Sequence, residues 1–174
     1  VPLPDADLGP DTAFCFGDAF SKTLNPGTFN SYQWSTGDTT QTIVIGAFDS
    51  AYAVTVTDST GCVNSDNISV TENSLPNPNL GADTSYCEGV TFAVALSPGG
   101  FQQYQWSDGS TGPILLVTQG GYYEVTVTDV NGCVNTDDLL VTELPKPMVN
   151  LGPDVTLCED SSFSITLDAS AALP

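Results

Sequence analysis

The sequence predicts an all-β protein built from tandem antiparallel β-sandwiches, with two complete copies and a partial third. A Leu-Gly-Pro/Ala-Asp motif begins at residues 8, 80 and 151, so one unit recurs after 72 and then 71 residues. Apolar and polar residues alternate along most segments, as they do in strands with one buried face. Clusters of Gly, Asn and Asp separate these segments and predict turns. A chain that repeats one unit is an array, and arrays commonly serve as spacers or adhesive rods.

The first half of the unit is clearest in the second copy. Segment 91–96 places its large apolar side chains on one face and small or polar ones on the other. A strand at 104–106 carries Tyr and Trp, and segment 108–112 is rich in Gly, Ser and Asp, which favours a turn. Another short apolar strand follows at 115–117.

The second half of the unit contains the strongest strand signal. Residues 123–128 alternate strictly between apolar and polar side chains. Residues 129–132 include Asn-Gly, which supplies positive φ angles and predicts a turn. A last strand contains Leu139 and Val141. Six or seven short strands with turns between them predict an antiparallel β-sandwich.

The repeats define the domain boundaries. Prolines alternate between the repeats, and they hold a chain extended and stiff, so we expect a semi-rigid rod. The chain opens inside a linker and closes partway through a repeat, so we expect a piece of a longer protein or a third repeat completed by another chain. The divisions are a linker end at 1–7, repeat 1 at 8–74, a Pro-rich linker at 75–79, repeat 2 at 80–143, a second Pro-rich linker at 144–150, and the first strands of repeat 3 at 151–174.

Five cysteines occupy equivalent places in the repeats. Cys15, Cys87 and Cys158 lie early in each copy, whereas Cys62 and Cys133 lie late. We expect disulfides within each complete repeat, joining Cys15 to Cys62 and Cys87 to Cys133 and leaving Cys158 unpaired in this chain. Such a framework is typical of an oxidising, extracellular compartment. A zinc site is disfavoured because the chain has no His.

Aromatic positions also favour an immunoglobulin-like architecture. Trp34 and Trp106 each lie between the two cysteines of their repeat. Tyr52 and Tyr123 open the penultimate strand, where a tyrosine corner packs its ring inward and bonds its hydroxyl to backbone. The first cysteine precedes the first strong strand, which departs from the antibody disulfide pattern.

Charge excludes several classes of function. With 21 acidic and 2 basic side chains the formal charge is −19, so nucleic acid and anionic membrane surfaces would repel the chain. No apolar run is long enough to span a bilayer. The chain has no His, so nucleophile–base catalysis has no obvious residues and we expect no enzyme. The expected partners are neighbouring repeats of the same protein and other copies in a filament.

Acidic turns raise the question of calcium. Carboxylates from stacked repeats could surround a Ca²⁺ ion, which prefers oxygen ligands. The alternative is that each Asp caps its own turn through its side chain. We expect no other cofactor. The candidate ligands are Asp11, Asp58, Asp83, Asp129 and Asp154.

Two glycosylation patterns occur in the first repeat. Asn67 opens an Asn-Ile-Ser sequon. A second pattern, Asp followed by Ser or Thr and then an apolar residue or Thr, gives four candidate O-glycosylation sites. These are Thr12, Thr39, Ser50 and Ser59.

Three motifs together resemble the Ig-like, PKD-like tandem repeats of Bacteroidota surface proteins. They are Leu-Gly-Pro-Asp-x-x-x-Cys at 8–15, Tyr-x-Trp-Ser-x-Gly-x-Thr at 32–39 and Tyr-x-Val-Thr-Val-Thr-Asp-x-x-Gly-Cys at 52–62. Such repeats occur in large adhesins, including gliding-motility adhesins, and in proteins exported by the type IX system. The resemblance implies a secreted or surface-anchored structural or adhesive role, and it implies no particular ligand.

The sequence therefore predicts a stiff, disulfide-stapled spacer in an extracellular rod, filament or adhesin. The alternative is a glycan- or protein-binding Ig-like module of a secreted multidomain protein. Exposed aromatic residues distinguish the two. Trp34 and Trp106 alternate with the core set and so are expected to point inward, which favours the spacer.

Overall fold

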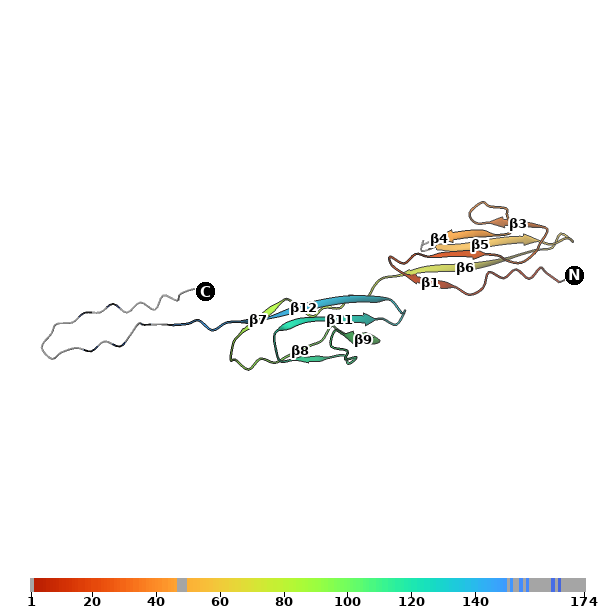
Figure 1. Cartoon of the computed structure of the whole chain (residues 1–174). Coiled ribbons are helices and arrows are strands. Elements are labelled where there is room, and N and C mark those ends of the chain that lie inside the picture. Colours follow the sequence, from red (N-terminus) through yellow and green to blue (C-terminus); the bar gives the residue numbers. More distant parts are fainter. Residues whose placement is uncertain are drawn as a thin grey trace.

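The computed structural model describes residues 2–46 and 50–149, together with residues 151, 154, 156, 164 and 166. Two β-sandwiches lie end to end along the chain, and we call them module 1 and module 2 (Figure 1). The described residues form strands, turns and loops, and they contain no helix able to span a membrane. The predicted all-β, immunoglobulin-like fold is confirmed for both modules.

The described residues of module 1 form six strands in two sheets. The larger sheet has the order β1-β6-β5-β3, and β2 pairs with β4 in the smaller one. The strands are β1 (Thr12–Cys15), β2 (Ser21–Leu24), β3 (Ser31–Trp34), β4 (Ile43–Gly46), β5 (Ser50–Thr57) and β6 (Val63–Asn73).

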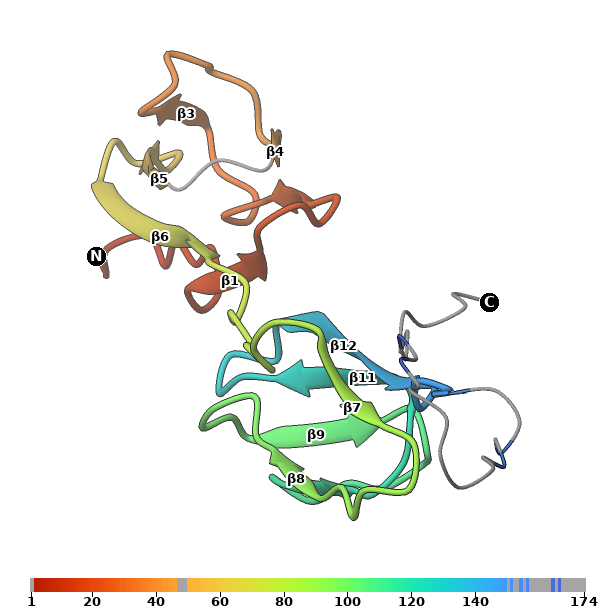
Figure 2. The ribbon, with the colours of Figure 1, turned by 90° about the vertical axis from the view of Figure 1, so that its left-hand side faces the viewer.

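Module 2 repeats this arrangement strand for strand. Its larger sheet has the order β7-β12-β11-β9, and β8 pairs with β10. Figure 2 shows β8 below β9, on the side of β9 away from β12. The strands are β7 (Thr84–Cys87), β8 (Val94–Leu96), β9 (Gln103–Trp106), β10 (Leu115–Val117), β11 (Gly121–Thr128) and β12 (Val134–Leu144).

One edge of each larger sheet departs from the predicted antiparallel pairing. β1 runs parallel to β6, so that Thr12 lies opposite Val70 and Cys15 opposite Asn73. β7 runs parallel to β12 in the same way, with Cys87 opposite Leu144. All other pairs are antiparallel. The first and last strands of a module therefore end side by side.

Each sandwich has its own apolar core between the two sheets. Trp34 and Trp106 are each only 2% exposed, which confirms that the tryptophans point inward. Each indole N–H donates to a backbone carbonyl, Thr40 O in module 1 and Gly112 O in module 2, at 2.8 Å in both. Burying an indole with its polar group satisfied stabilises the core without an unpaired donor. Neither tryptophan is available as a surface platform.

The segments rich in proline pack onto the modules that follow them. Pro4 is buried, and its carbonyl accepts from Asn64 Nδ2 at 2.8 Å. Pro76 is buried equivalently, and its carbonyl accepts from Asn135 Nδ2 at 2.8 Å. Since β6 ends at Asn73, only residues 74–75 separate the last strand of module 1 from the first anchored residue of module 2.

The first strands expected for repeat 3 fall almost entirely outside the described residues. Cys158, which the sequence predicts to be unpaired, lies outside them as well.

Candidate functional site at the joint between the modules

Each module has two distinct ends. The entry pole holds the Asp-to-Cys turn before the last strand, which spans residues 58–62 in module 1 and 129–133 in module 2. The exit pole holds the adjacent ends of the first and last strands. In the two-module chain, the exit pole of module 1 faces the entry pole of module 2, and the joint lies between them (Figure 1).

A disulfide crosses this joint. Cys15 at the exit pole of module 1 is bonded to Cys133 at the entry pole of module 2, with an S–S distance of 1.97 Å and a Cα–Cα distance of 5.6 Å. Cys62 and Cys87 carry free thiols. The predicted pairing of Cys15 with Cys62 and of Cys87 with Cys133 is therefore wrong. The staple connects neighbouring modules, and neither module has an internal bridge among its described residues.

The position of β1 along β6, together with its parallel direction, is the physical reason for this pairing. Cys15 lies opposite Asn73, at the end of β6, whereas Cys62 immediately precedes the start of β6. An extended strand rises about 3.3 Å per residue, so the two cysteines of module 1 lie roughly 35 Å apart. A disulfide requires Cα atoms within about 7 Å. Because β1 pairs only with the last four residues of β6, Cys15 lies out of reach of Cys62.

The turn at the entry pole is held by one carboxylate. In module 2, Asp129 Oδ1 accepts from the N–H groups of Asn131 at 2.8 Å and Cys133 at 2.9 Å. Gly132 has a φ of 83°, as the Asn-Gly signal predicted. This geometry fixes the backbone of Cys133, which is 1% exposed, so that its sulfur faces module 1.

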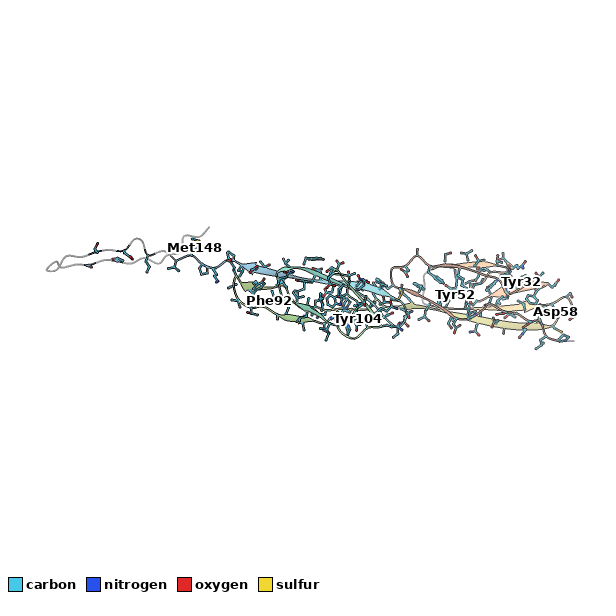
Figure 3. The ribbon with its side chains drawn as sticks, turned by 60° about the horizontal axis from the view of Figure 1, so that its bottom comes forward. Tyr32, Tyr52, Asp58, Phe92, Tyr104 and Met148 are labelled. Atoms are coloured by element: carbon cyan, nitrogen blue, oxygen red, sulfur yellow. A yellow bond between two sulfur atoms is a disulfide. The ribbon has the colours of Figure 1, made fainter. Side chains whose placement is uncertain are left out.

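Module 1 carries the same turn. Asp58 Oδ1 accepts from the N–H groups of Thr60 at 2.7 Å and Cys62 at 3.0 Å. The Thr60 hydroxyl also donates to it at 2.7 Å, and this hydrogen bond is the main cause that lowers the pKa of Asp58 below its ordinary value. In Figure 3, Asp58 marks the end of module 1 that points away from module 2.

A second connection lies close to the disulfide. On module 1 it leaves from Asn73, the register partner of Cys15. On module 2 it arrives at Pro76, which bonds to Asn135, two residues beyond Cys133. Neighbouring strands are about 4.8 Å apart, so the linker peptide and the disulfide are two closely spaced covalent connections between the modules. Two connections resist twisting of one module against the other far better than one.

The candidate calcium ligands instead serve the backbone. Asp11 Oδ1 accepts from Ser69 N at 2.8 Å and Asp83 Oδ1 accepts from Leu140 N at 2.9 Å, in each case across the parallel edge. With Asp58 and Asp129 in the entry turns, these carboxylates are distributed over both modules, and Asp154 is exposed. Among the described residues, no three His, Cys, Asp or Glu side chains are grouped to hold a metal. A calcium role stays a prediction.

The candidate glycosylation sites differ in their accessibility. Thr39, Ser50, Ser59 and Asn67 are exposed, whereas Thr12 is half-buried in β1. Attachment of a sugar to any of them stays a prediction.

The tyrosines stabilise loops. Tyr104 accepts from Phe101 N at 2.7 Å and donates to Gly99 O at 3.0 Å, and Tyr32 makes the equivalent bonds to Phe29 and Gly27. Tyr123 donates to Gln119 O at 3.0 Å, which confirms the tyrosine corner in module 2. For Tyr52 the equivalent acceptor would be residue 48, which lies outside the described residues.

Comparisons with known proteins report only distant similarity. No protein-family model matches the chain, and no curated protein matches it in sequence. Solved structures that resemble it include DIP-gamma IG1+IG2, with a TM-score of 0.42, 12% identity, and coverage of 80% of this chain and 98% of that one. For the titin domains I67–I69 the TM-score is 0.46 and the identity 9%, with 80% of this chain and 64% of that one covered. For murine CEACAM1b the values are 0.39 and 12%, with 78% and 96% covered.

The sequence alone missed the joint. Its signal was present in the order of the elements, because Cys133 directly precedes the 11-residue strand β12, while the linker directly follows the equivalent strand β6 in module 1. The second cysteine of a module and the start of the following linker therefore lie at opposite ends of that module, because the last strand separates them.

Proposed function

We propose that the chain is a load-bearing spacer in an extracellular rod, filament or adhesin. The observation that carries this proposal is the bond between Cys15 and Cys133, which joins the end of β1 in one module to the start of β12 in the next. The resemblance to Bacteroidota Ig-like surface repeats supports a secreted or surface-attached setting. The disulfide supports an oxidising compartment.

The staple creates a short covalent path along the rod. Tension applied to the chain ends runs through residues 2–15, across the disulfide, and along 133–149. This path uses β1 and β12, which are already extended along the long axis (Figure 1). The bonded cysteines are 118 residues apart in sequence, and the residues between them hold most of both cores. Because a covalent bond carries the load past these residues, tension does not unfold them.

A single-molecule pulling experiment tests this function. The complete chain is held by its two ends under non-reducing conditions, with Cys133→Ser as the test variant and Cys62→Ser as the matched control. The disulfide keeps the residues between Cys15 and Cys133 from extending under tension. At about 3.5 Å per extended residue, their full length is about 400 Å. We expect Cys133→Ser to release this length in unfolding steps, whereas the native chain and Cys62→Ser release none of it. Steps of module length in the oxidised native chain would refute the proposal.

The binding-module alternative has one supporting feature. A shallow polar recess on module 2 is lined by side chains of β9 and β11 and their neighbours, of the kind that can hydrogen-bond a sugar. Its aromatic residue, Tyr104, already uses its hydroxyl within the module. Binding of the oxidised chain to a glycan array, lost on Gln103→Ala, would favour this alternative. The lining residues are Gln102, Gln103, Tyr104, Gln105, Thr111, Thr126 and Thr128.

A further inference from the structure

Two free thiols lie at the poles of modules 1 and 2 that face away from the joint. Cys62 is in the entry pole of module 1, and Cys87 is in the exit pole of module 2. They are the repeat equivalents of Cys133 and Cys15, the two residues that form the staple.

The backbone around each free cysteine matches that of its bonded equivalent. At the exit poles, Phe16 N donates to Asn73 O and Glu88 N donates to Leu144 O, both at 2.8 Å. The next turn is also shared, with Asp18 N donating to Cys15 O at 3.0 Å and Val90 N donating to Cys87 O at 3.1 Å.

The entry poles match equally well. Asp58 N donates to Cys62 O at 3.0 Å, and Asp129 N donates to Cys133 O at the same distance. Gly61 and Gly132 have φ angles of 85° and 83°. The backbone around Cys62 and Cys87 therefore has the same local geometry as the backbone around Cys133 and Cys15, which form the disulfide.

Burial shows what the joint adds. Cys133 is 1% exposed, whereas its equivalent Cys62 is only half-buried. Cys15 is half-buried, whereas its equivalent Cys87 is exposed. The local turns are the same, so the neighbouring module accounts for the difference in cover. In the part of the chain that the structure describes, no module covers the poles that carry Cys62 and Cys87.

We propose that these two poles are the open halves of a second joint, and that the partner of each is another module of this repeat type. For the chain itself, the partner is a second copy, bonded head to tail through Cys87 of one copy and Cys62 of the next. This inference rests on the proposed rod function and deepens it, because it names the kind of partner that binds each of these two poles. Each copy keeps its own Pro-rich segments, so the disulfide is the covalent connection of this joint.

Charge complements this pairing. The exit pole of module 2 carries Lys146, one of only two basic residues in the chain, and its ammonium lies over Gly89 beside Cys87. The entry pole of module 1 carries Asp58 beside Cys62. In the existing joint the position equivalent to Lys146 is Leu75. The open joint thus places a cation opposite a carboxylate, which disfavours pairing of two like poles.

The bond forms by thiol–disulfide exchange with a small-molecule disulfide such as oxidised glutathione. The Cys62 thiolate attacks the glutathione disulfide, giving a mixed disulfide and one reduced glutathione. The Cys87 thiolate of a second copy then attacks the Cys62 sulfur and releases the second glutathione. Two protein thiols are oxidised, one glutathione disulfide is reduced, and the two thiol protons pass to solvent and to the departing thiolates.

Pairing of two full-length variants tests the proposal. Both carry Cys158→Ser, one carries Cys62→Ser so that only Cys87 is free, and the other carries Cys87→Ser so that only Cys62 is free. They are mixed in a glutathione redox buffer, and non-reducing mass spectrometry counts the dimers. In an equal mixture, random pairing gives a 1:1 ratio of mixed 87–62 dimers to like dimers. We expect this ratio to rise about tenfold, the factor that corresponds to 1.4 kcal/mol of joint contacts.

Matched charge variants sharpen the result. Lys146→Gln, at the pole, should reduce the excess of mixed dimer, whereas Lys22→Gln, on β2, should leave it unchanged. A statistical mixture of dimers, a preference for like pairs, or no dimer at all would overturn the inference. The proposed rod function would still stand if the pulling experiment shows that residues 16–132 do not extend under tension. The inference and the proposed function can therefore fail separately.

Discussion

The entry poles of the two modules have the same turn, but only one of their cysteines forms a disulfide. In both, an Asp carboxylate accepts from the cysteine N–H, and a glycine with positive φ precedes the cysteine. Yet Cys133 is buried and bonded, while Cys62 is half-buried and free. The difference lies entirely in what faces each turn. Local sequence prepares a cysteine for bonding, and the neighbouring module decides whether it bonds.

The cores of the modules, by contrast, are alike and self-contained. Phe14 and Phe20 stack at 4.9 Å in module 1, and Tyr86 and Phe92 stack at 4.5 Å in the equivalent place. Each core cluster contains residues of one module only. The core of each sandwich therefore depends on residues of that module alone. The orientation of one module relative to the next depends on the contacts and the disulfide at the joint.

The largest expected effect, summed over both modules, comes from breaking the disulfide between Cys15 and Cys133. When either module unfolds in the native chain, the linker and the disulfide close a loop of roughly 60 residues, which by the chain-entropy estimate disfavours the unfolded state by about 4 kcal/mol. We expect Cys133→Ser to lower the stability of both modules by an amount approaching this value. Urea unfolding under non-reducing conditions, followed by tryptophan fluorescence, measures it.

Cys62→Ser is the matched control for that experiment. It removes the equivalent thiol in the other module and leaves the staple intact, so its cost should stay within about 0.5 kcal/mol. Equal losses for the two variants would mean that the joint contributes nothing to stability.

The next effect separates the two cores. Trp106→Ala should destabilise module 2 by about 3–5 kcal/mol, because it removes a fully buried ring and leaves a cavity. Trp34 then remains as the single tryptophan, and its fluorescence reports on module 1 alone. Trp34→Ala should give the mirror result. If the remaining tryptophan followed the mutated module in unfolding, the cores would not be independent.

The smallest effect concerns the turns. Gly132→Ala and Gly61→Ala should each cost about 1 kcal/mol, since a β-carbon is disfavoured at positive φ. No atom lies within 4 Å of either added β-carbon, so backbone strain is the only cost. Comparison of the two urea midpoints tests whether the turns are equivalent. A much larger loss for Gly132→Ala would show that the occupied joint tolerates less movement than the open one.

Much of the fold could be predicted because its signals are local. Alternation placed Phe92, Val94 and Leu96 on one face, and Leu96 is buried with the other two packed against the same core. The Asn-Gly pair located the turn before Cys133. The inward tryptophans followed from the same alternation, and with them the lack of a tryptophan platform for sugars.

The disulfide prediction failed because it depended on a property that no local pattern carries. By itself the sequence determined the repeat, the strands, the turns and the apolar faces, since each depends on residues close together in the chain. Only the tertiary structure decided that β1 runs parallel to β6 and β7 parallel to β12. A four-residue edge strand can pair in either direction with its side chains on the same faces. The alternation of apolar and polar residues therefore does not reveal the direction of the strand. That direction, together with the pairing of β1 with the last residues of β6, places Cys15 at the exit pole, out of reach of Cys62 and within reach of Cys133.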